Sequence, residues 1–248
     1  MNTRALKILA VSLGLCAAAG NLAAQVTLTN LYSFSSTGNG ATNGYNPVAG
    51  LVQGTDGNFY GTTEEDGLGG NAGTAFRISP SGNLTTLWTF DLQLIPGAFD
   101  YDGRSPKAGL VQGNDGYFYG TTYSGGTNNG SGTVFRISTS GSLTMLHTFH
   151  ETGNILDGSG PEAGVVQGND GYFYGTTSGS GINANGTIYR VDSTGSSYTT
   201  LHSFTNNPDG AVPKAGLVQG SDGNFYGTTS EGGLMAVAPF SSITRTAL

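Results

Sequence analysis

One stretch of fifteen residues occurs four times in this chain and constrains its fold more than any other feature. Each copy runs from an Ala-Gly pair through Val-Gln-Gly and Asp-Gly to Phe-Tyr-Gly-Thr-Thr, and the copies occupy residues 49–63, 108–122, 163–177 and 215–229. They begin 59, 55 and then 52 residues apart. Repetition at such intervals indicates one supersecondary unit per repeat, with neighbouring units stacked against each other.

The repeated stretch has the pattern of a β-hairpin. A short apolar run leads into an Asp-Gly turn, and an aromatic, threonine-rich run follows. An aspartate in such a turn accepts hydrogen bonds from backbone N–H groups two residues on, and the glycine adopts a positive φ without steric cost. We therefore assign a turn role, and no catalytic role, to Asp56, Asp115, Asp170 and Asp222.

Two further β-type runs complete each unit. A variable Gly/Asn-rich loop precedes a run such as 133–138 (TVFRIS), and a Ser/Thr-Gly turn precedes a run such as 143–149 (LTMLHTF). Four strands per repeat are typical of a propeller blade rather than of a thin solenoid coil. Phe118 and Tyr119 in the second run should point to opposite faces, where neighbouring blades would cover them. We predict an all-β fold, a β-propeller of about four four-stranded blades; a β-sandwich built from the same hairpins is the alternative.

The two ends of the repeat array are irregular. Residues 28–34 (LTNLYSF) match a fourth strand with no strands before it, whereas 232–240 (GGLMAVAPF) depart from the expected third run. If residues 234–238 nevertheless form the third strand, the N-terminal strand would complete the last blade and close the ring. The other interpretation is an unfinished last blade in a fragment of a larger ring. The expected divisions are a leader, a repeat domain and a divergent tail at residues 1–24, 25–233 and 234–248.

The first residues have the pattern of a secretory signal peptide. Arg4 and Lys7 precede an apolar run over 8–19, and small residues stand before Gln25. The run is too short to cross a bilayer comfortably, and no downstream stretch could serve as an anchor. Cys16, the single cysteine, would leave with the leader, so the exported chain would hold no disulfide. We therefore expect a secreted, periplasmic or cell-surface protein without membrane insertion.

The charge balance narrows the class of partner. The predicted leader contains two of the 9 basic residues and none of the 16 acidic ones, which leaves a net charge of −9 on the remainder. No basic cluster is present, so nucleic acid and anionic membranes are not expected as partners.

The complete repeat motif resembles a known family. It combines Pro-x-Ala-Gly-Leu-Val-Gln-Gly-x-Asp-Gly-x-Phe-Tyr-Gly-Thr-Thr with Gly-Thr-Val-Phe-Arg-Ile and Leu-Thr-x-Leu-His-x-Phe, and it extends over most of residues 28–233. This pattern closely resembles the Gloeo/Verruco (GloVer) tandem-repeat proteins. The resemblance implies propeller-like blades on exported bacterial proteins, often with a C-terminal anchoring segment and with no established activity. The chain departs from the family pattern after Gly233 and shows no recognisable anchor.

Loop variability indicates where function would lie. In an up-and-down blade the turns after the first and third strands lie on one face of the ring and are short and uniform here. The loops after the second and fourth strands vary, and they lie on the other face, which we call the variable-loop face. Binding residues often lie on variable loops of a rigid scaffold. The candidate ligand-binding residues there are Glu64, Glu65, Asp66, Tyr101, Asp102, Tyr123, His150, Glu151, Asp157 and Asp209.

Three of these candidates belong to a recurring Asp-Gly pair that precedes a proline. The aspartates are Asp102, Asp157 and Asp209. A ring of carboxylates could bind Ca²⁺. An Asx-type turn feeding the next first strand explains the same pattern, and we favour it because no loop has the dense acidic spacing of a calcium loop. We predict no metal and no cofactor.

The histidines divide into two classes. His147 and His202 occupy a position where other copies have Trp88 and Tyr32, which indicates an aromatic packing position. His150, beside Glu151, breaks the repeat and is conceivable as a general acid or base, but the sequence places no second catalytic group near it.

Aromatic and amide side chains offer a different chemistry. Tyr117, Tyr172, Asn58 and Asn224 in the repeats, with Tyr101 and Tyr123 in loops, could stack on and hydrogen-bond to sugars. They are also ordinary strand and turn residues.

No sequence pattern of a catalytic triad, P-loop, metalloprotease or dinucleotide site is present. We therefore expect an exported, non-enzymatic binding or cell-envelope module for a glycan or protein partner. The alternatives are a propeller-type lyase or hydrolase with an acidic site on the variable-loop face, and a fragment that self-associates through open strand edges.

Overall fold

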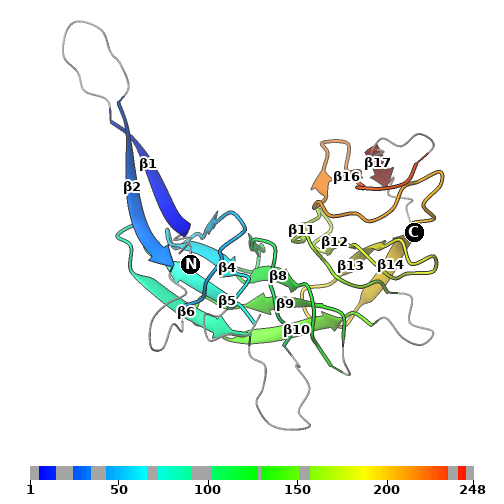
Figure 1. Cartoon of the computed structure of the whole chain (residues 1–248), viewed down its shortest axis with the longest axis horizontal. Coiled ribbons are helices and arrows are strands. Elements are labelled where there is room, and N and C mark those ends of the chain that lie inside the picture. The colour runs from blue at the N-terminus through cyan, green and yellow to red at the C-terminus, as the bar shows by residue number, and fades with distance from the viewer. Residues whose placement is uncertain are drawn as a thin grey trace, which may run out of the picture.

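The computed structural model describes residues 6–14, 25–34, 43–65, 72–90, 102–127, 130–150, 157–233 and 240–243. Within these ranges the regular elements are all β-strands, and they form antiparallel sheets (Figure 1). A helix long and apolar enough to cross a membrane is not found in the described residues. The prediction of an all-β fold is confirmed.

Each repeat forms its own sheet, in which consecutive strands pair as an antiparallel meander. Blade 1 contains β3 (Val52–Gln53), β4 (Phe59–Thr63), β5 (Thr74–Ile78) and β6 (Leu84–Thr89). Blade 2 contains β7 (Val111–Gln112), β8 (Phe118–Thr122), β9 (Thr133–Ile137) and β10 (Leu143–Thr148). Blade 3 contains β11 (Val166–Gln167), β12 (Phe173–Thr177), β13 (Thr187–Val191) and β14 (Tyr198–Ser203). These four-stranded sheets are propeller blades, as predicted.

The last repeat forms a sheet of three described strands, which we call blade 4. Its strands are β15 (Val218–Gln219), β16 (Phe225–Thr228) and β17 (Phe240–Ile243). The third strand is therefore at 240–243; the proposed third strand at 234–238 lies outside the described residues.

At the other end of the chain, β1 (Leu6–Gly14) pairs with β2 (Gln25–Phe34) in an antiparallel sheet of two strands. β1 was not predicted as a strand, because its apolar run was interpreted as part of a leader. Ile8 and Val11 are β-branched residues that favour extended backbone, which is consistent with strand formation there. The leader function itself stays a prediction.

In blades 1, 2 and 3 a β-bulge recurs where the third strand pairs with the fourth. The register skips one leucine of the fourth strand, which is Leu87 in blade 1, Leu146 in blade 2 and Leu201 in blade 3. The β1–β2 pair has the same irregularity at Leu31. A bulge places two residues opposite one and increases the local twist. β1 and β2 therefore pair like a third and a fourth strand.

Aromatic rings join consecutive blades. Tyr60 of blade 1 stacks on Phe118 of blade 2 with ring centroids 3.8 Å apart, and Tyr119 stacks on Phe173 of blade 3 at 3.7 Å. The third junction repeats the contact at 4.0 Å. Adjacent residues of one strand point to opposite faces, so the second strands of blades 2 and 3 each contact one neighbouring blade with their phenylalanine and the other with their tyrosine. The predicted orientation of Phe118 and Tyr119 is confirmed.

The short first strands are linked by glutamine side chains. Gln112 Oε1 accepts a hydrogen bond of 3.0 Å from the Thr55 backbone N–H of the preceding blade. Gln167 and Gln219 repeat this contact at the next two junctions, each at 3.0 Å. One interface geometry is therefore used three times.

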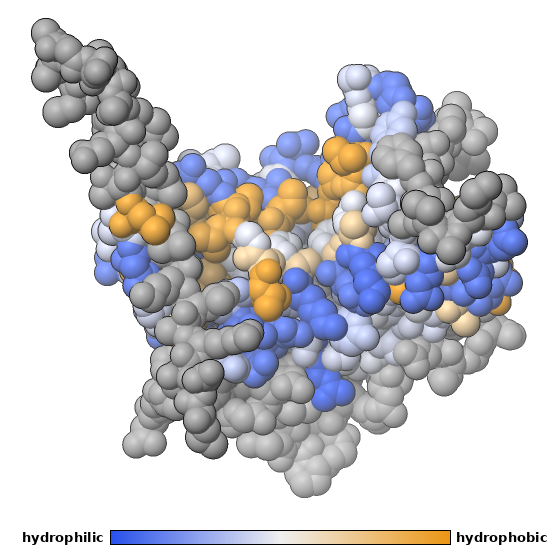
Figure 2. All heavy atoms as spheres, turned by 45° about the horizontal axis from the view of Figure 1, so that its top comes forward, coloured by the Kyte–Doolittle hydropathy of each residue, from blue (hydrophilic) through white to orange (hydrophobic). Residues whose placement is uncertain are grey.

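The described blades follow one another along an open arc (Figure 1). β2 lies at one end of the arc and β17 lies at the other, so no described strand closes a ring. Of the two interpretations of the N-terminal strand, completion of the last blade is not what the described residues form, because β2 pairs with β1. Figure 2 shows an apolar band in the hollow of the arc.

Candidate functional site

The variable-loop face is organised by a contact that recurs in every repeat. A ring from the end of the fourth strand binds the polar residue that opens the next Asp-Gly or Asn-Gly turn. The distances are 2.8 Å from Trp88 Nε1 to Asp102 Oδ2, 2.8 Å from His147 Nε2 to Asp157 Oδ2, 2.7 Å from His202 Nε2 to Asp209 Oδ2, and 2.8 Å from Asn43 Nδ2 to Tyr32 OH.

Both partners of this contact can be predicted from the sequence, but the local sequence does not predict the contact between them. The predicted packing position of His147 and the predicted turn at Asp157 agree with the structure. The sequence does contain a sign of this contact, because the ring residue and the turn residue change together between repeats. Trp or His pairs with Asp, whereas Tyr32 pairs with Asn43.

Threonines of blade 3 hold the backbone of the Asp157 turn in position. Gly158 has a φ of 98°, and a Cβ there would collide with the hydroxyl of Thr177. Thr177 Oγ1 lies 2.7 Å from Thr187 Oγ1, and Thr187 Oγ1 donates to the Asp157 carbonyl at 3.1 Å. The Asp157 carboxylate is thus fixed in position by the backbone as well as by its ring partner, which supports the predicted turn role.

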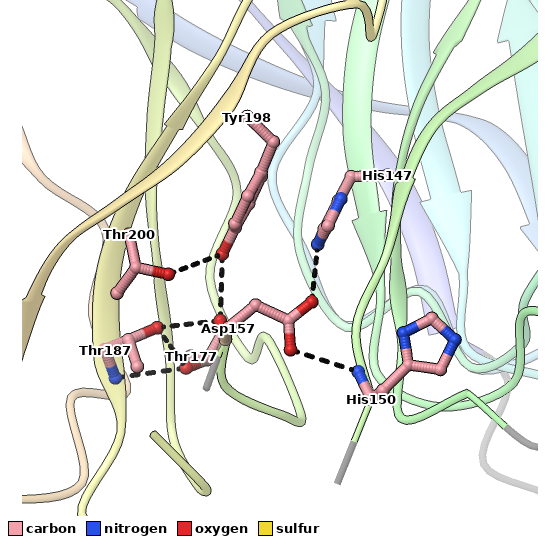
Figure 3. A network of polar contacts seen from close by, with 7 residues as sticks. All are labelled: His147, His150, Asp157, Thr177, Thr187, Tyr198 and Thr200. Atoms are coloured by element: carbon pink, nitrogen blue, oxygen red, sulfur yellow. Dashed lines mark hydrogen bonds and ion pairs between the residues drawn. The ribbon is translucent and has the colours of Figure 1, made fainter. Parts of the chain in front are cut away.

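Asp157 is the centre of a polar network on this face (Figure 3). Its side chain is buried; one carboxylate oxygen binds His147, and the other accepts the backbone N–H of His150 at 3.3 Å. Its carbonyl oxygen accepts the Tyr198 hydroxyl at 2.8 Å. The His147 ring stacks on Tyr198 with centroids 3.6 Å apart and planes 6° apart. The network therefore joins blade 2 to blade 3.

Tyr198 keeps its proton in this setting. Burial raises the pKa of its hydroxyl well above the usual value, the hydrogen bond with Thr200 acts in the opposite direction, and the nearby charge of Asp157 raises it further. The hydroxyl is a neutral hydrogen-bond donor at physiological pH.

His150 was the candidate general acid or base. It contributes its backbone N–H to Asp157, and Figure 3 shows its ring directed away from that carboxylate. Glu151 lies outside the described residues. Among the described residues, no hydrogen bond joins a carboxylate to the His150 ring.

The remaining candidates are distributed among the repeats. Glu64 Oε2 accepts a hydrogen bond of 3.0 Å from Asn46 Nδ2, and the Glu65 backbone pairs with Tyr45. The Lys107 ammonium lies 3.3 Å from the ring centre of Tyr123. Asp66 and Tyr101 lie outside the described residues.

Two aspartates, Asp157 and Asp209, have a histidine partner, and the Asp209 carboxylate is the more exposed of the two. Burial acts to raise its pKa, but hydrogen bonds from Thr205 and His202 outweigh that effect and hold the pKa of the Asp209 carboxyl below its usual range. Asp209 is therefore ionised at neutral pH.

No three His, Cys, Asp or Glu side chains gather as a metal site within the described ranges. The described candidates do not form one cluster: His150 and Asp157 meet in one network, and the others are distributed over the loops of different repeats.

The opposite face contains the Asp-Gly hairpin turns. Asp56 Oδ2 accepts the Tyr60 hydroxyl at 2.7 Å, and Oδ1 accepts the backbone N–H of Asn58 at 3.1 Å. Burial and the hydrogen bond to Asp56 raise the pKa of Tyr60 to about 12. The same Tyr-Asp contact recurs at 2.6 to 2.7 Å in the other three repeats. The predicted turn role of these aspartates is confirmed.

The side chains considered for sugar stacking also have structural contacts. The Arg136 and Arg190 guanidinium groups lie 4.7 and 4.8 Å from the ring centres of Tyr117 and Tyr172. The amide of Asn58 donates to Asp56 at 2.8 Å. One ring face of each of these tyrosines is thus covered by its own blade.

Several solved structures are similar to the chain. An α-L-arabinanase of Penicillium chrysogenum, solved with arabinobiose, has 12% identity and a TM-score of 0.48 over 81% of this chain and 62% of that chain. An endo-arabinase of Bacteroides thetaiotaomicron has 14% identity and a TM-score of 0.44 over 89% and 83%. A xylan β-1,4-xylosidase of Bacillus halodurans has 14% identity and a TM-score of 0.42 over 88% and 46%. The chain thus spans less than two thirds of the first and third of these proteins.

None of the curated proteins compared with this sequence matches it. The Gloeobacter/Verrucomicrobia repeat matches at residues 20–166 and 106–237, in agreement with the resemblance seen in the repeat motif. These two overlapping matches extend over most of the 248 residues, and the chain therefore belongs to the Gloeobacter/Verrucomicrobia repeat family.

Proposed function

We propose that this chain is an exported, non-enzymatic module that binds a glycan or protein partner on its variable-loop face. The observation that carries the proposal is the recurring contact between a fourth-strand ring and the Asp-Gly or Asn-Gly turn. In this contact the fourth-strand ring and the turn carboxylate or amide bind each other and hold the scaffold in place, while the loops beside them differ in length and sequence. A rigid scaffold with variable loops is suited to recognition.

The charge of the chain defines the chemistry of a suitable partner. The full sequence has a net charge of −7 and an acidic pair, Glu64 and Glu65, on the first variable loop. A neutral glycan or a basic protein surface fits this face better than an anionic polymer does.

An enzymatic function, with His150 as general acid or base, has less support. Catalysis of that kind needs a second group within hydrogen-bond reach of the reacting atoms. The described carboxylate nearest in the network, Asp157, binds the His147 ring and the His150 backbone instead.

The test is binding of the full chain to immobilised neutral polysaccharides and to basic peptides, followed by surface plasmon resonance. We expect saturable binding that Glu64→Gln weakens several-fold. Thr139→Lys raises the net charge by the same single unit in a turn on the opposite face and is the matched control. Binding that both substitutions reduce equally, or turnover of a polysaccharide that His150→Ala abolishes, would contradict the proposal.

A further inference from the structure

The three junctions between blades share one set of contacts. We call the side of a blade that faces the next blade along the chain its forward face, and the opposite side its rear face. At each junction the forward face supplies a valine of the first strand and a tyrosine and a threonine of the second strand. The rear face of the next blade supplies an apolar residue, a phenylalanine and an alanine carbonyl. At the first junction the Thr62 hydroxyl donates to the Ala108 carbonyl at 2.8 Å. The hydroxyls of Thr121 and Thr176 do the same at 2.9 and 3.3 Å.

The forward face of blade 4 has the same residue types but is exposed. Val218 is 62% exposed, whereas the equivalent valines, such as Val111 and Val166, are half-buried. Thr228 is exposed, whereas Thr121 is buried. This face is therefore one half of a blade junction.

The rear face of blade 1 is the matching half. Leu51 is 38% exposed, whereas Leu110 at the same position is 7% exposed. Phe59 is half-buried, whereas Phe118 and Phe173 are fully buried. The two incomplete halves are thus complementary by the same rules that build the three junctions.

β2 already occupies one place in the missing junction. Its Phe34 contacts Phe76 of blade 1 with ring centroids 5.2 Å apart, as Phe90 contacts Phe135 at 5.0 Å at the next junction. A Cβ on Gly82 would lie 2.7 Å from the Leu31 carbonyl oxygen, and the equivalent Cβ on Gly141 lies 2.6 Å from that of Leu87. β2 therefore stands as the fourth strand of a blade that would precede blade 1.

β2 is the kind of strand that blade 4 lacks among its described residues. Blade 4 has a first, second and third strand among the described residues, and β2 has the register of a fourth strand. β1 occupies the third-strand place beside β2, so β1 and β17 compete for the same edge. An exposed edge with apolar neighbours favours pairing with another strand.

A second copy of the chain is the partner that the arc geometry favours. The two half-junctions lie at opposite ends of the arc (Figure 1), so one copy would have to bend at all three junctions to join them. Those junctions are tightly packed, with stacked rings 3.7 to 4.0 Å apart, and packed interfaces do not deform continuously. Head-to-tail contacts close into a ring when the rotation between copies permits it.

We propose that two copies form a ring in which the forward face of blade 4 packs on the rear face of blade 1 of the partner, and β2 exchanges β1 for the β17 of the other copy. β1 lies in the predicted leader, so it covers the edge of β2 only until the leader is removed or displaced. Loss of β1 from this edge is the step that permits assembly.

The test weakens β1 in the full chain with Ile8→Pro and Val11→Pro, since proline cannot donate to a strand ladder. Light scattering after size-exclusion chromatography should give the mass of one copy for the unaltered chain and a doubled mass for the proline variant. Adding Val218→Lys should restore the mass of one copy. Ile182→Lys, at a side chain that is 67% exposed, is the matched control and should leave the doubled mass unchanged.

Three outcomes would overturn the proposal. These are the mass of one copy for the folded proline variant at every concentration, a doubled mass that persists with Val218→Lys, and particles larger than two copies. A doubled mass for the unaltered chain would contradict the role of β1. Circular dichroism of each variant establishes that its blades are folded.

Discussion

At the residue scale, the buried carboxylate of Asp157 is the group on which the variable-loop face depends most. Asp157→Ala would remove a buried carboxylate and leave His147 Nε2 and the His150 N–H, which are half-buried, without this acceptor. We expect a loss of about 1–3 kcal/mol in the free energy of unfolding, measured by urea denaturation. Asp209→Ala is the comparison: that pair is 41% and 27% exposed, so its removal should cost less, about 1 kcal/mol or below. Equal losses would show that burial does not decide the energy of this contact.

The same pair gives a prediction for pH. The pKa of the Asp209 carboxyl is below its usual value of 3.8 in the folded state, so its contacts stabilise the fold above that value. This contribution falls as the pH falls through the folded-state pKa, because protonation then favours the unfolded chain. The difference in melting temperature between the unaltered chain and Asp209→Asn should therefore shrink as the pH falls below 3.8. A difference that keeps its size or grows below pH 3.8 would contradict the assignment.

Some residue roles can be predicted from the local sequence, and others cannot. The turn role of Asp56 follows from its Asp-Gly context alone, and the structure confirms it. The partner of Asp157 does not follow from local context, because His147 is ten residues away and the loop between them differs in each repeat.

At the element scale, glycine in the middle of the second strand gives room to two side chains, one from the residue just before the first strand and one from the third strand. A Cβ on Gly120 would lie 2.7 Å from both Leu110 and Phe135. Gly120→Ala should therefore destabilise blade 2 by about 1–3 kcal/mol in urea denaturation. Gly216→Ala places the same methyl group at ordinary contact distances of 3.6 and 3.9 Å and should change stability little. A neutral Gly120→Ala would mean that the blade interior yields more easily than its packing indicates.

Strand positions could be predicted well wherever the repeat supplied several copies. The expected runs at 133–138 and 143–149 correspond to β9 and β10 within one residue. β1 and β17 could not be predicted because both lie outside the repeats. β1 has the sequence of a leader, and β17 lies beyond the point where the family pattern ends. Their pairing is set by available strand edges, which a local pattern does not report.

At the scale of the whole molecule, stability comes from junctions between blades. Phe173 is fully buried and stacked on Tyr119, so Phe173→Ala should cost about 3–5 kcal/mol. Phe59 has the same place at the exposed end of the array and is half-buried, so Phe59→Ala should cost clearly less. Denaturation of both variants measures the difference. Equal costs would mean that the end of the array is as well covered as its middle.

The most direct test of the open array of blades is small-angle X-ray scattering of the full chain in dilute solution. We expect a particle with the mass of one copy and a scattering curve that agrees with the open arc of Figure 1. A curve that instead requires a compact ring closed within one copy, with β2 beside β17, would show that the array is not open.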